Sequence, residues 1–448
     1  MAPHRLQCLL ARGIALSALA ATPLPARAHP VLTLTVSEHS VSITPGGQPA
    51  PPDASYPLTV TLGHRYLSYE RDGKRYIDDF ATARAFALDL AAHTYEENSL
   101  YADIGFRVHE LENRLVLGRA LAAGKVKLDM FAPANVEHEI GVEAAGENSA
   151  IDSTTQGDER VFRWKGHEFL AVSRASSPLP AEYAGEYWRF LRYFTGGHPK
   201  IYRELAHYAG VPALVRIEVT NAYQLTRTIK LAAIDVRPDE DYTLAGFTRA
   251  APVDDPDKTI ALLGADGPAS VAAAVATTKA ERERFLGEGR VFDAFLRHLA
   301  IVIENGDASA DWLAANRARM QADPDVARLS AALKPRSAAE AEQAVKLLTA
   351  LRDADPVRRY LLDVFLGNTY SKLGRDKERI ERMLAALHAN PYLTGAWFDL
   401  GAMYDGAFEP GYAWACWDAA RRLVPDHPFG QSINAREKAL RAGHPEFF

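Results

Sequence analysis

The chain has 448 residues, of which 48% are hydrophobic and 24% charged, with 51 Lys and Arg against 57 Asp and Glu. This length exceeds one ordinary hydrophobic core and predicts two or three domains. A net charge of -6 argues against nucleic-acid binding, which uses concentrated positive charge, and the composition matches neither a disordered chain nor a membrane bundle.

Residues 1–28 have the pattern of a secretory signal peptide. They lack acidic side chains, begin with Arg5 and Arg12, continue through a short apolar run and end in an Ala-Arg-Ala sequence. We expect cleavage after Ala28. A membrane anchor needs about 20 apolar residues, which is more than this run contains, so no transmembrane segment is expected in the mature chain. The expected location is the periplasm or the extracellular space.

Cleavage at this position affects one cysteine and one histidine. Cys416 becomes the only cysteine, so the mature chain cannot form an internal disulfide. His29 becomes the first residue, where an amino group and an imidazole can bind copper together. No second histidine motif supports such a site, and we therefore expect no cofactor and no metal.

The next segments predict an antiparallel sheet. Residues 29–57 are expected to form a strand, with Leu32, Leu34 and Val36 on one face, followed by a Pro-rich linker. Residues 58–250 are expected to form an α+β domain. Its short β-branched and aromatic runs, including residues 100–109, predict strands, and Asp72-Gly73 predicts a tight hairpin turn.

Helices are expected to cover one face of this sheet. They are predicted over 111–123, 181–194 and 199–208, and further strands over 160–164, 167–173, 214–219 and 225–236. Residues 251–276 are expected to form a linker, and residues 277–448 an all-helical domain with helices over 282–304, 311–321, 325–333 and 338–354.

Two segments of the helical domain repeat at an offset of 34 residues. The first copy carries Leu366, Gly367, Tyr370, Ala386 and Pro391, and the second carries Leu400, Gly401, Tyr404, Ala420 and Pro425 together with Trp397, Ala413 and Trp417. A fixed period of this length is typical of stacked helical pairs, and the pattern resembles the tetratricopeptide repeat. The first copy departs from the pattern, with Asp363 in place of the tryptophan and Arg379 at the second small-residue position.

The resemblance implies a concave groove that binds a protein or peptide partner. The first helix of each pair would line this groove with Leu361, Val364, Asn368, Ser371, Gly395, Phe398, Ala402 and Asp405. This lining is mixed and contains no cluster of Lys or Arg, which a site that clamps carboxylates would need.

No catalytic residues are predicted. The pairs His109-Glu110, His138-Glu139 and His167-Glu168 each begin like a zinc-protease helix but lack the second histidine four residues after the first. Glu137 and His138 could hold a metal only with a distant ligand. His198, in a Gly-Gly-His-Pro turn, is a further candidate for a functional residue.

The sequence therefore predicts an exported, non-enzymatic interaction protein that binds its partner through the repeats. A first alternative is a periplasmic carrier of a lipid or another apolar ligand, because a sheet with helices over one face is similar to periplasmic lipoprotein carriers. Tyr183, Tyr187, Trp188 and Phe194 would then line a cavity, although ordinary core packing also explains such residues. A second alternative is a hydrolase whose residues form no readable motif.

Overall fold

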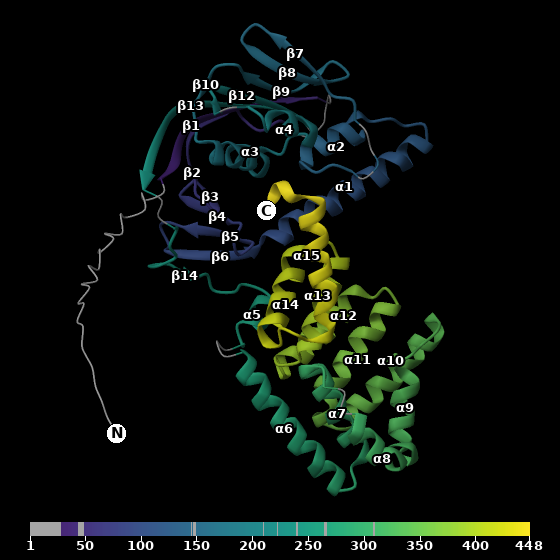
Figure 1. Ribbon diagram of the computed structural model, residues 1–448. Coiled ribbons are helices and arrows are strands. Elements are labelled where there is room, and N and C mark those ends of the chain that lie inside the picture. The colour runs from purple at the N-terminus through teal and green to yellow at the C-terminus, as the bar shows by residue number, and fades with distance from the viewer. Residues whose placement is uncertain are drawn as a thin grey trace, which may run out of the picture.

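The structure is a computed structural model that describes residues 28–43, 49–144, 146, 149–208, 210–221, 223–238, 241–263, 267–307 and 310–448 (Figure 1). The predicted signal peptide lies outside these residues, apart from Ala28. A large sheet with helices comes first, and an all-helical region follows it. The expected fold class, an antiparallel sheet domain with covering helices followed by an all-helical domain, is confirmed.

The main sheet contains twelve described strands in the order β14-β6-β5-β4-β3-β2-β1-β13-β12-β9-β8-β7. Its neighbours pair antiparallel, except that β14 runs parallel to β6. The strands are β1 (Ala28–Ser42), β2 (Ala54–Leu62), β3 (Tyr66–Arg71), β4 (Lys74–Asp79), β5 (Arg84–Asp89), β6 (Thr94–Ser99), β7 (Asp152–Gln156), β8 (Glu159–Trp164), β9 (His167–Ser173), β12 (Leu214–Thr220), β13 (Tyr223–Pro238) and β14 (Thr248–Arg249), while β10 (Ser176–Ser177) and β11 (Val211–Pro212) form a separate pair.

Strand β1 lies in the middle of the sheet. It pairs with β13 along its whole length and with β2 on its other side. Leu32, Leu34 and Val36 are buried, as their alternation predicts. The Asp72-Gly73 turn joins β3 to β4 with φ values of 52° and 75°, the left-handed conformation of a tight hairpin.

Four helices accompany the sheet, namely α1 (Leu100–Ala123), α2 (Pro133–Ile140), α3 (Ala181–Thr195) and α4 (Pro199–Leu205). The sheet curves around α3 and α4 (Figure 1). The prediction of a strand over residues 100–109 is wrong, because Ser99 caps a helix there by accepting a hydrogen bond from the Tyr101 amide at 3.2 Å. The buried residues Leu100, Ile104 and Leu111 then follow helical spacing.

The helical region begins after β14. Its helices are α5 (Asp257–Ile260), α6 (Gly267–Gly287), α7 (Val291–Asn305), α8 (Ala310–Ala322), α9 (Pro324–Ala332), α10 (Ala338–Ala354), α11 (Arg359–Lys372), α12 (Asp376–Ala389), α13 (Thr394–Gly406), α14 (Pro410–Leu423) and α15 (Gln431–Gly443), with single 3-10 turns at Pro356–Arg358, Pro428–Gly430 and Pro445–Phe447. The prediction of one helix over residues 282–304 is wrong, since Gly289 turns the chain with a φ of 77° between α6 and α7.

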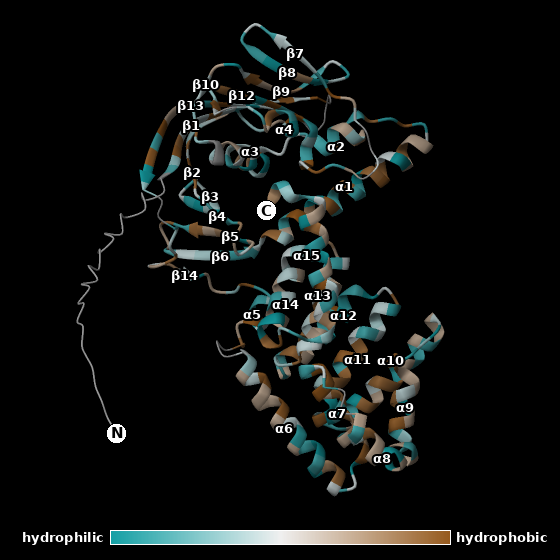
Figure 2. Ribbon diagram, viewed as in Figure 1, coloured by the Kyte–Doolittle hydropathy of each residue, from teal (hydrophilic) through white to brown (hydrophobic). Residues whose placement is uncertain are grey.

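Each of these helices carries both hydrophobic and hydrophilic residues (Figure 2), as amphipathic helices that pack on one another do. Among the described helices, none is both long enough and apolar enough to span a lipid bilayer.

The sheet domain and the helical region share a packed interface. The Tyr101 ring of α1 stacks on Trp414 of α14 with ring centroids 5.0 Å apart. Residues 445–448 lie beneath the curved sheet, where the C-terminus is marked in Figure 1. Phe447 is fully buried there, and its carbonyl oxygen accepts a hydrogen bond from the Tyr193 hydroxyl at 2.8 Å. Arg189 donates to the Phe448 oxygen at 3.1 Å. The last residues of the chain thus join the two parts.

Candidate functional site

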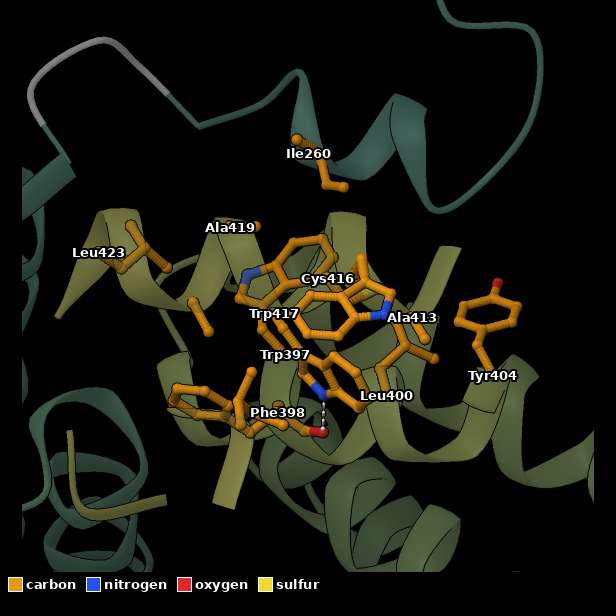
Figure 3. Packing of buried hydrophobic residues seen from close by; sticks show 14 of the residues in the cluster. Ile260, Trp397, Phe398, Leu400, Tyr404, Ala413, Cys416, Trp417, Ala419 and Leu423 are labelled. Carbon is orange, nitrogen blue, oxygen red and sulfur yellow. Dashed lines mark hydrogen bonds between the residues drawn. The ribbon is translucent and has the colours of Figure 1, made fainter. Parts of the chain in front are cut away.

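Each copy of the 34-residue pattern forms two packed helices, α11 with α12 and α13 with α14. In the second copy the Trp417 ring lies in a buried cluster with Trp397, Phe398 and Leu400 (Figure 3). A Cβ on Gly401 would be 2.3 Å from Trp417 Nε1, so this ring lies directly against Gly401. The Trp417 Nε1–H donates to the Phe398 carbonyl at 3.2 Å. The remaining pattern residues that are buried are Trp397, Leu400, Tyr404, Ala413 and Ala420, while Pro425 is exposed.

The first copy packs in a similar way despite its departures from the pattern. Leu366, Gly367, Tyr370 and Ala386 are buried and Pro391 is half-buried. The side chain of Asp363 is buried and accepts a hydrogen bond from Arg352 Nε at 2.7 Å. Arg379 donates to the Met403 carbonyl of α13 at 2.8 Å. The two unusual residues therefore bind neighbouring helices through polar contacts.

Part of the expected groove lining is covered by α7 of the same chain. Leu361 belongs to a buried cluster with Leu296 of α7, and Val364 to a second cluster with Ile301. A Cβ on Gly395 would lie 3.3 Å from the Ile303 side chain. The lining residues Leu361, Val364 and Gly395 are therefore buried. Phe398 is also buried, but it packs against His427, with ring centroids 5.5 Å apart.

The lining at the other end of these helices is polar. Asp405 pairs with Arg436 of α15 at 2.7 Å, and His109 of α1 lies 3.6 Å from its second oxygen. Ser371 is exposed and lies 3.5 Å from Arg379 Nη1. The sheet domain thus contributes a side chain at the Asp405 end of the predicted groove.

A cavity of about 480 Å³, which we call the α13–α15 pocket, lies beside α13. Its lining consists of Phe398, Asp399, Ala402, Trp417, Pro428, Phe429, Gln431, Ser432 and Ile433. The Phe429 ring is 50% exposed, and Ala402 is exposed beside it. Of the residues predicted for the groove, Phe398 and Ala402 line this pocket, and Asn368 lies next to it through a hydrogen bond to Asp399.

Asp399 is the charged group of the α13–α15 pocket. Its Oδ2 accepts a hydrogen bond from Asn368 Nδ2 at 2.9 Å, and it forms no ion pair within the described part of the chain. Burial raises the pKa of Asp399, while the Asn368 amide lowers it part of the way back. A carboxylate with a neutral partner retains the capacity to bind a cationic or N–H donor.

The sequence analysis missed Asp399, Phe429 and Ser432. The repeat period contains a signal for two of them, because Phe429 and Ser432 stand 34 residues after Gly395 and Phe398. Phe429 on the 3-10 turn at Pro428–Gly430 and Ser432 on α15 therefore stand where the period would place the first helix of a further repeat.

A second polar cluster joins residues that the sequence analysis considered as metal ligands. His198 Nε2 lies 3.2 Å from Glu137 Oε2, and the His198 amide donates to His138 Nδ1 at 3.0 Å. His138 Nε2–H in turn donates to the Glu218 carbonyl at 2.8 Å. All three side chains are buried. Among the described residues, no group of three or more His, Cys, Asp or Glu side chains is placed to hold a metal.

The protonation of this cluster follows from its hydrogen bonds. Burial and the nearby charge of His198 lower the pKa of His138 to about 3, so its imidazole is neutral. Burial acts to raise the pKa of Glu137, but hydrogen bonds from His198, Ala144 and Ser149 lower it overall. A neutral imidazole and a fully hydrogen-bonded carboxylate link α2 to α4 and to β12, which is a structural role.

The aromatic residues considered for an apolar cavity pack against one another. Tyr187 and Trp188 lie edge to face with centroids 5.1 Å apart, and Phe190 stacks on Phe194 at 5.3 Å. Tyr183, Tyr187 and Trp188 are buried in the core between α3 and the sheet. These side chains contact protein, and the apolar-ligand role stays a prediction.

Comparisons with known proteins give little information on this site. No family model matches the chain, and no curated protein does either. Among solved structures, one titled "Lipid-protein interactions in lipovitellin" matches with 9% identity and a TM-score of 0.18. The match covers 94% of this chain and 54% of that chain, so this protein spans about half the length of its match. A likeness at this TM-score supports no inference about fold or function.

Proposed function

We propose that this protein binds a peptide segment of a partner protein in the α13–α15 pocket, as a non-enzymatic interaction protein of the tetratricopeptide type. The proposal rests on two groups that line the same cavity. One is the half-exposed Phe429 ring, and the other is the Asp399 carboxylate, whose hydrogen-bond partner is the neutral amide of Asn368. An aromatic wall beside a charged group is typical of sites that hold one apolar and one polar side chain of a partner.

The charge of the pocket selects the chemistry of the peptide. Asp399 favours a Lys, an Arg or an N-terminal amine, and Phe429 favours an apolar residue next to it. The net charge of -6 also favours encounter with a basic partner. With the signal peptide proposed for residues 1–28, the partner would be met in the periplasm or outside the cell.

Selection of displayed random peptides on the purified full-length protein tests this proposal. We expect enrichment of peptides with a basic residue beside an apolar residue. Ala402→Arg should abolish their binding because it fills the pocket and adds a positive charge. Asp399→Asn should weaken binding about tenfold, since a hydrogen bond to a charged group contributes about 1.5–3 kcal/mol.

Ala385→Arg is the matched control. Ala385 is also an exposed alanine of a repeat helix, but it lies on α12 and does not line the pocket. This variant should bind the selected peptides as the unmodified protein does. Peptides that bind equally well to the Ala402→Arg variant would show that the pocket is not their site and would refute the proposal.

A further inference from the structure

Two cavities meet where the sheet domain, the connecting segment and α14 come together. Their volumes are about 230 and 500 Å³. They share Glu97 and Asn98 of β6, Arg249 of β14, Ile260 of α5, and Gly411 and Arg422 of α14. Because their linings overlap, they form one continuous space, which we call the interdomain cleft. Its residues come from segments far apart in the sequence.

The arginines of the interdomain cleft differ in their partners. Arg84 is neutralised by Asp418, at 2.5 Å, and by Glu97, at 3.5 Å. Arg249 and Arg422 make neither a hydrogen bond nor an ion pair with any described residue. Burial lowers the pKa of Arg422 and the neighbouring positive charge of Arg249 lowers it further, while the charges of Glu97 and Asp418 raise it part of the way back. Two exposed guanidinium groups, one from β14 and one from α14, therefore lie near each other, with Glu97 and Asp418 close to Arg422 and Asp257 close to Arg249 but in no direct ion pair with them.

The rest of the interdomain cleft limits what can bind there. Ile260 and Leu263 are buried apolar residues of its wall, and Ala415 continues this wall on α14. The carboxylates that line the wider cavity are Glu96, Glu97, Asp254, Asp257 and Glu409. These carboxylates repel a ligand with several negative charges, while the apolar wall favours a ligand with a hydrophobic body. The cleft is therefore suited to a ligand with a single anionic group.

We propose that the interdomain cleft binds a small organic carboxylate with an apolar body, its carboxylate held between Arg249 and Arg422 and its apolar part against Ile260, Leu263 and Ala415. Arginine forms paired N–H···O bonds with a carboxylate, and small-molecule sites occur preferentially at domain interfaces. The bound molecule would contact both the sheet domain and the helical region. This site is separate from the α13–α15 pocket and does not depend on the function proposed for it.

Saturation-transfer NMR on the full chain with hexanoate as the probe tests this inference. We expect saturable transfer to the hexanoate chain that weakens as the salt concentration rises. Hexanol lacks the charge, acetate lacks the apolar body, and inorganic phosphate carries more charge, so each should bind more weakly than hexanoate. Arg249→Gln and Arg422→Gln should each reduce hexanoate affinity about tenfold, which is the effect expected for losing a charge-assisted hydrogen bond.

Gly411 supplies a test that leaves both arginines in place. Apart from its chain neighbours and the backbone of its own helix, no described atom lies within 4 Å of the position that a Cβ on Gly411 would take, so this residue faces open space in the cleft. Gly411→Phe should fill the cleft and abolish hexanoate binding, whereas Gly411→Ala should retain it. The Ala402→Arg variant of the α13–α15 pocket should also retain it, which separates this inference from the proposed function.

Three results would overturn the inference. Hexanol binding equal to that of hexanoate would show that the arginines take no part. Phosphate binding stronger than that of hexanoate would show that the apolar wall does not contribute. Hexanoate binding that persists unchanged in the Gly411→Phe variant would place the ligand elsewhere.

Discussion

Substitution of Gly401 by alanine tests the packing of the helical pairs directly. The new methyl group would lie 2.3 Å from Trp417 Nε1, which is closer than two non-bonded atoms can approach. Trp417 is buried and donates its Nε1–H to the Phe398 carbonyl at 3.2 Å. We therefore expect Gly401→Ala to displace the Trp417 ring and to break this hydrogen bond.

Three effects set the size of the change in the free energy of unfolding. Alanine stabilises a helix interior by about 1 kcal/mol relative to glycine. Overpacking a filled site costs about 1–3 kcal/mol, and a buried N–H donor left without a partner costs about 1–3 kcal/mol more. The sum predicts a net destabilisation of about 3 kcal/mol.

Thermal unfolding followed by far-UV circular dichroism measures this effect. A change of 1 kcal/mol shifts the midpoint by about 2–4 °C in a domain the size of the helical region, so Gly401→Ala should lower it by roughly 6–12 °C. Gly367→Ala should have a smaller effect, because its Cβ would be 3.1 Å from the Arg379 carbonyl oxygen. Gly411→Ala, which faces open space, should raise the midpoint slightly. A midpoint for Gly401→Ala equal to or above that of the unmodified protein would refute the packing argument.

Three other substitutions have expected outcomes. Phe447→Ala removes a fully buried ring and should cost about 3–5 kcal/mol, measured by thermal unfolding, while Phe429→Ala at its half-exposed position should cost far less. Burial, with the charge of Asp103, raises the pKa of Asp78 from 3.8 to about 7. The free energy of unfolding should therefore fall as the pH rises through this interval, because the buried carboxyl must ionise in the folded state. Asp78→Asn cannot ionise and should stabilise the protein at about pH 8 and not at about pH 4. The pKa of Glu137 is lower in the folded than in the unfolded state, so its carboxylate stabilises the fold above the unfolded-state pKa, and this stabilisation is lost as the pH falls. In urea titrations Glu137→Gln should therefore lower the free energy of unfolding more at neutral than at acidic pH.

The parts of the fold that the sequence predicts well are those that depend on local patterns. The alternation of Leu32, Leu34 and Val36 predicts a strand that the structure contains, and the Asp72-Gly73 turn needs only two residues to be recognised. The helix predicted over 338–354 has the same bounds as α10, because Ser337 caps it and Asp355-Pro356 follows its end. These signals act within a few residues of each other.

The errors occur where local signals are ambiguous. Residues 100–109 contain β-branched and aromatic residues that favour a strand, but the Ser99 cap and the contact of Tyr101 with Trp414 select a helix. Between α6 and α7, Gly289 ends one helix, and the similar composition on both sides hides the break. Tertiary contacts decide such cases, since propensity differences amount to about 1 kcal/mol.

The candidate site could be predicted only in part, because the residues that limit it come from outside the repeats. The 34-residue period places Leu361, Asn368 and Ala402 on the first helices of their pairs, but it carries no information on α7, which covers Leu361. The period also extends to Phe429 and Ser432, around the start of α15, although the sequence identity is lost there. Periodicity therefore predicts which positions face one side, and long-range packing decides which of them remain accessible.

The contacts around the α13–α15 pocket link its shape to the sheet domain. Arg436 of α15 holds Asp405 of α13 at 2.7 Å, and the same guanidinium lies 2.8 Å from His109 Nε2 of α1. Helix α15 leads directly into Phe447, which is buried beneath the sheet. Helix α15, one wall of the pocket, is therefore held to the sheet domain at its middle, through Arg436, and beyond its C-terminal end, through Phe447. It follows that the helical region cut free of the sheet would lose the contacts that position α15, and that a peptide selected on the full chain should bind such a fragment less tightly.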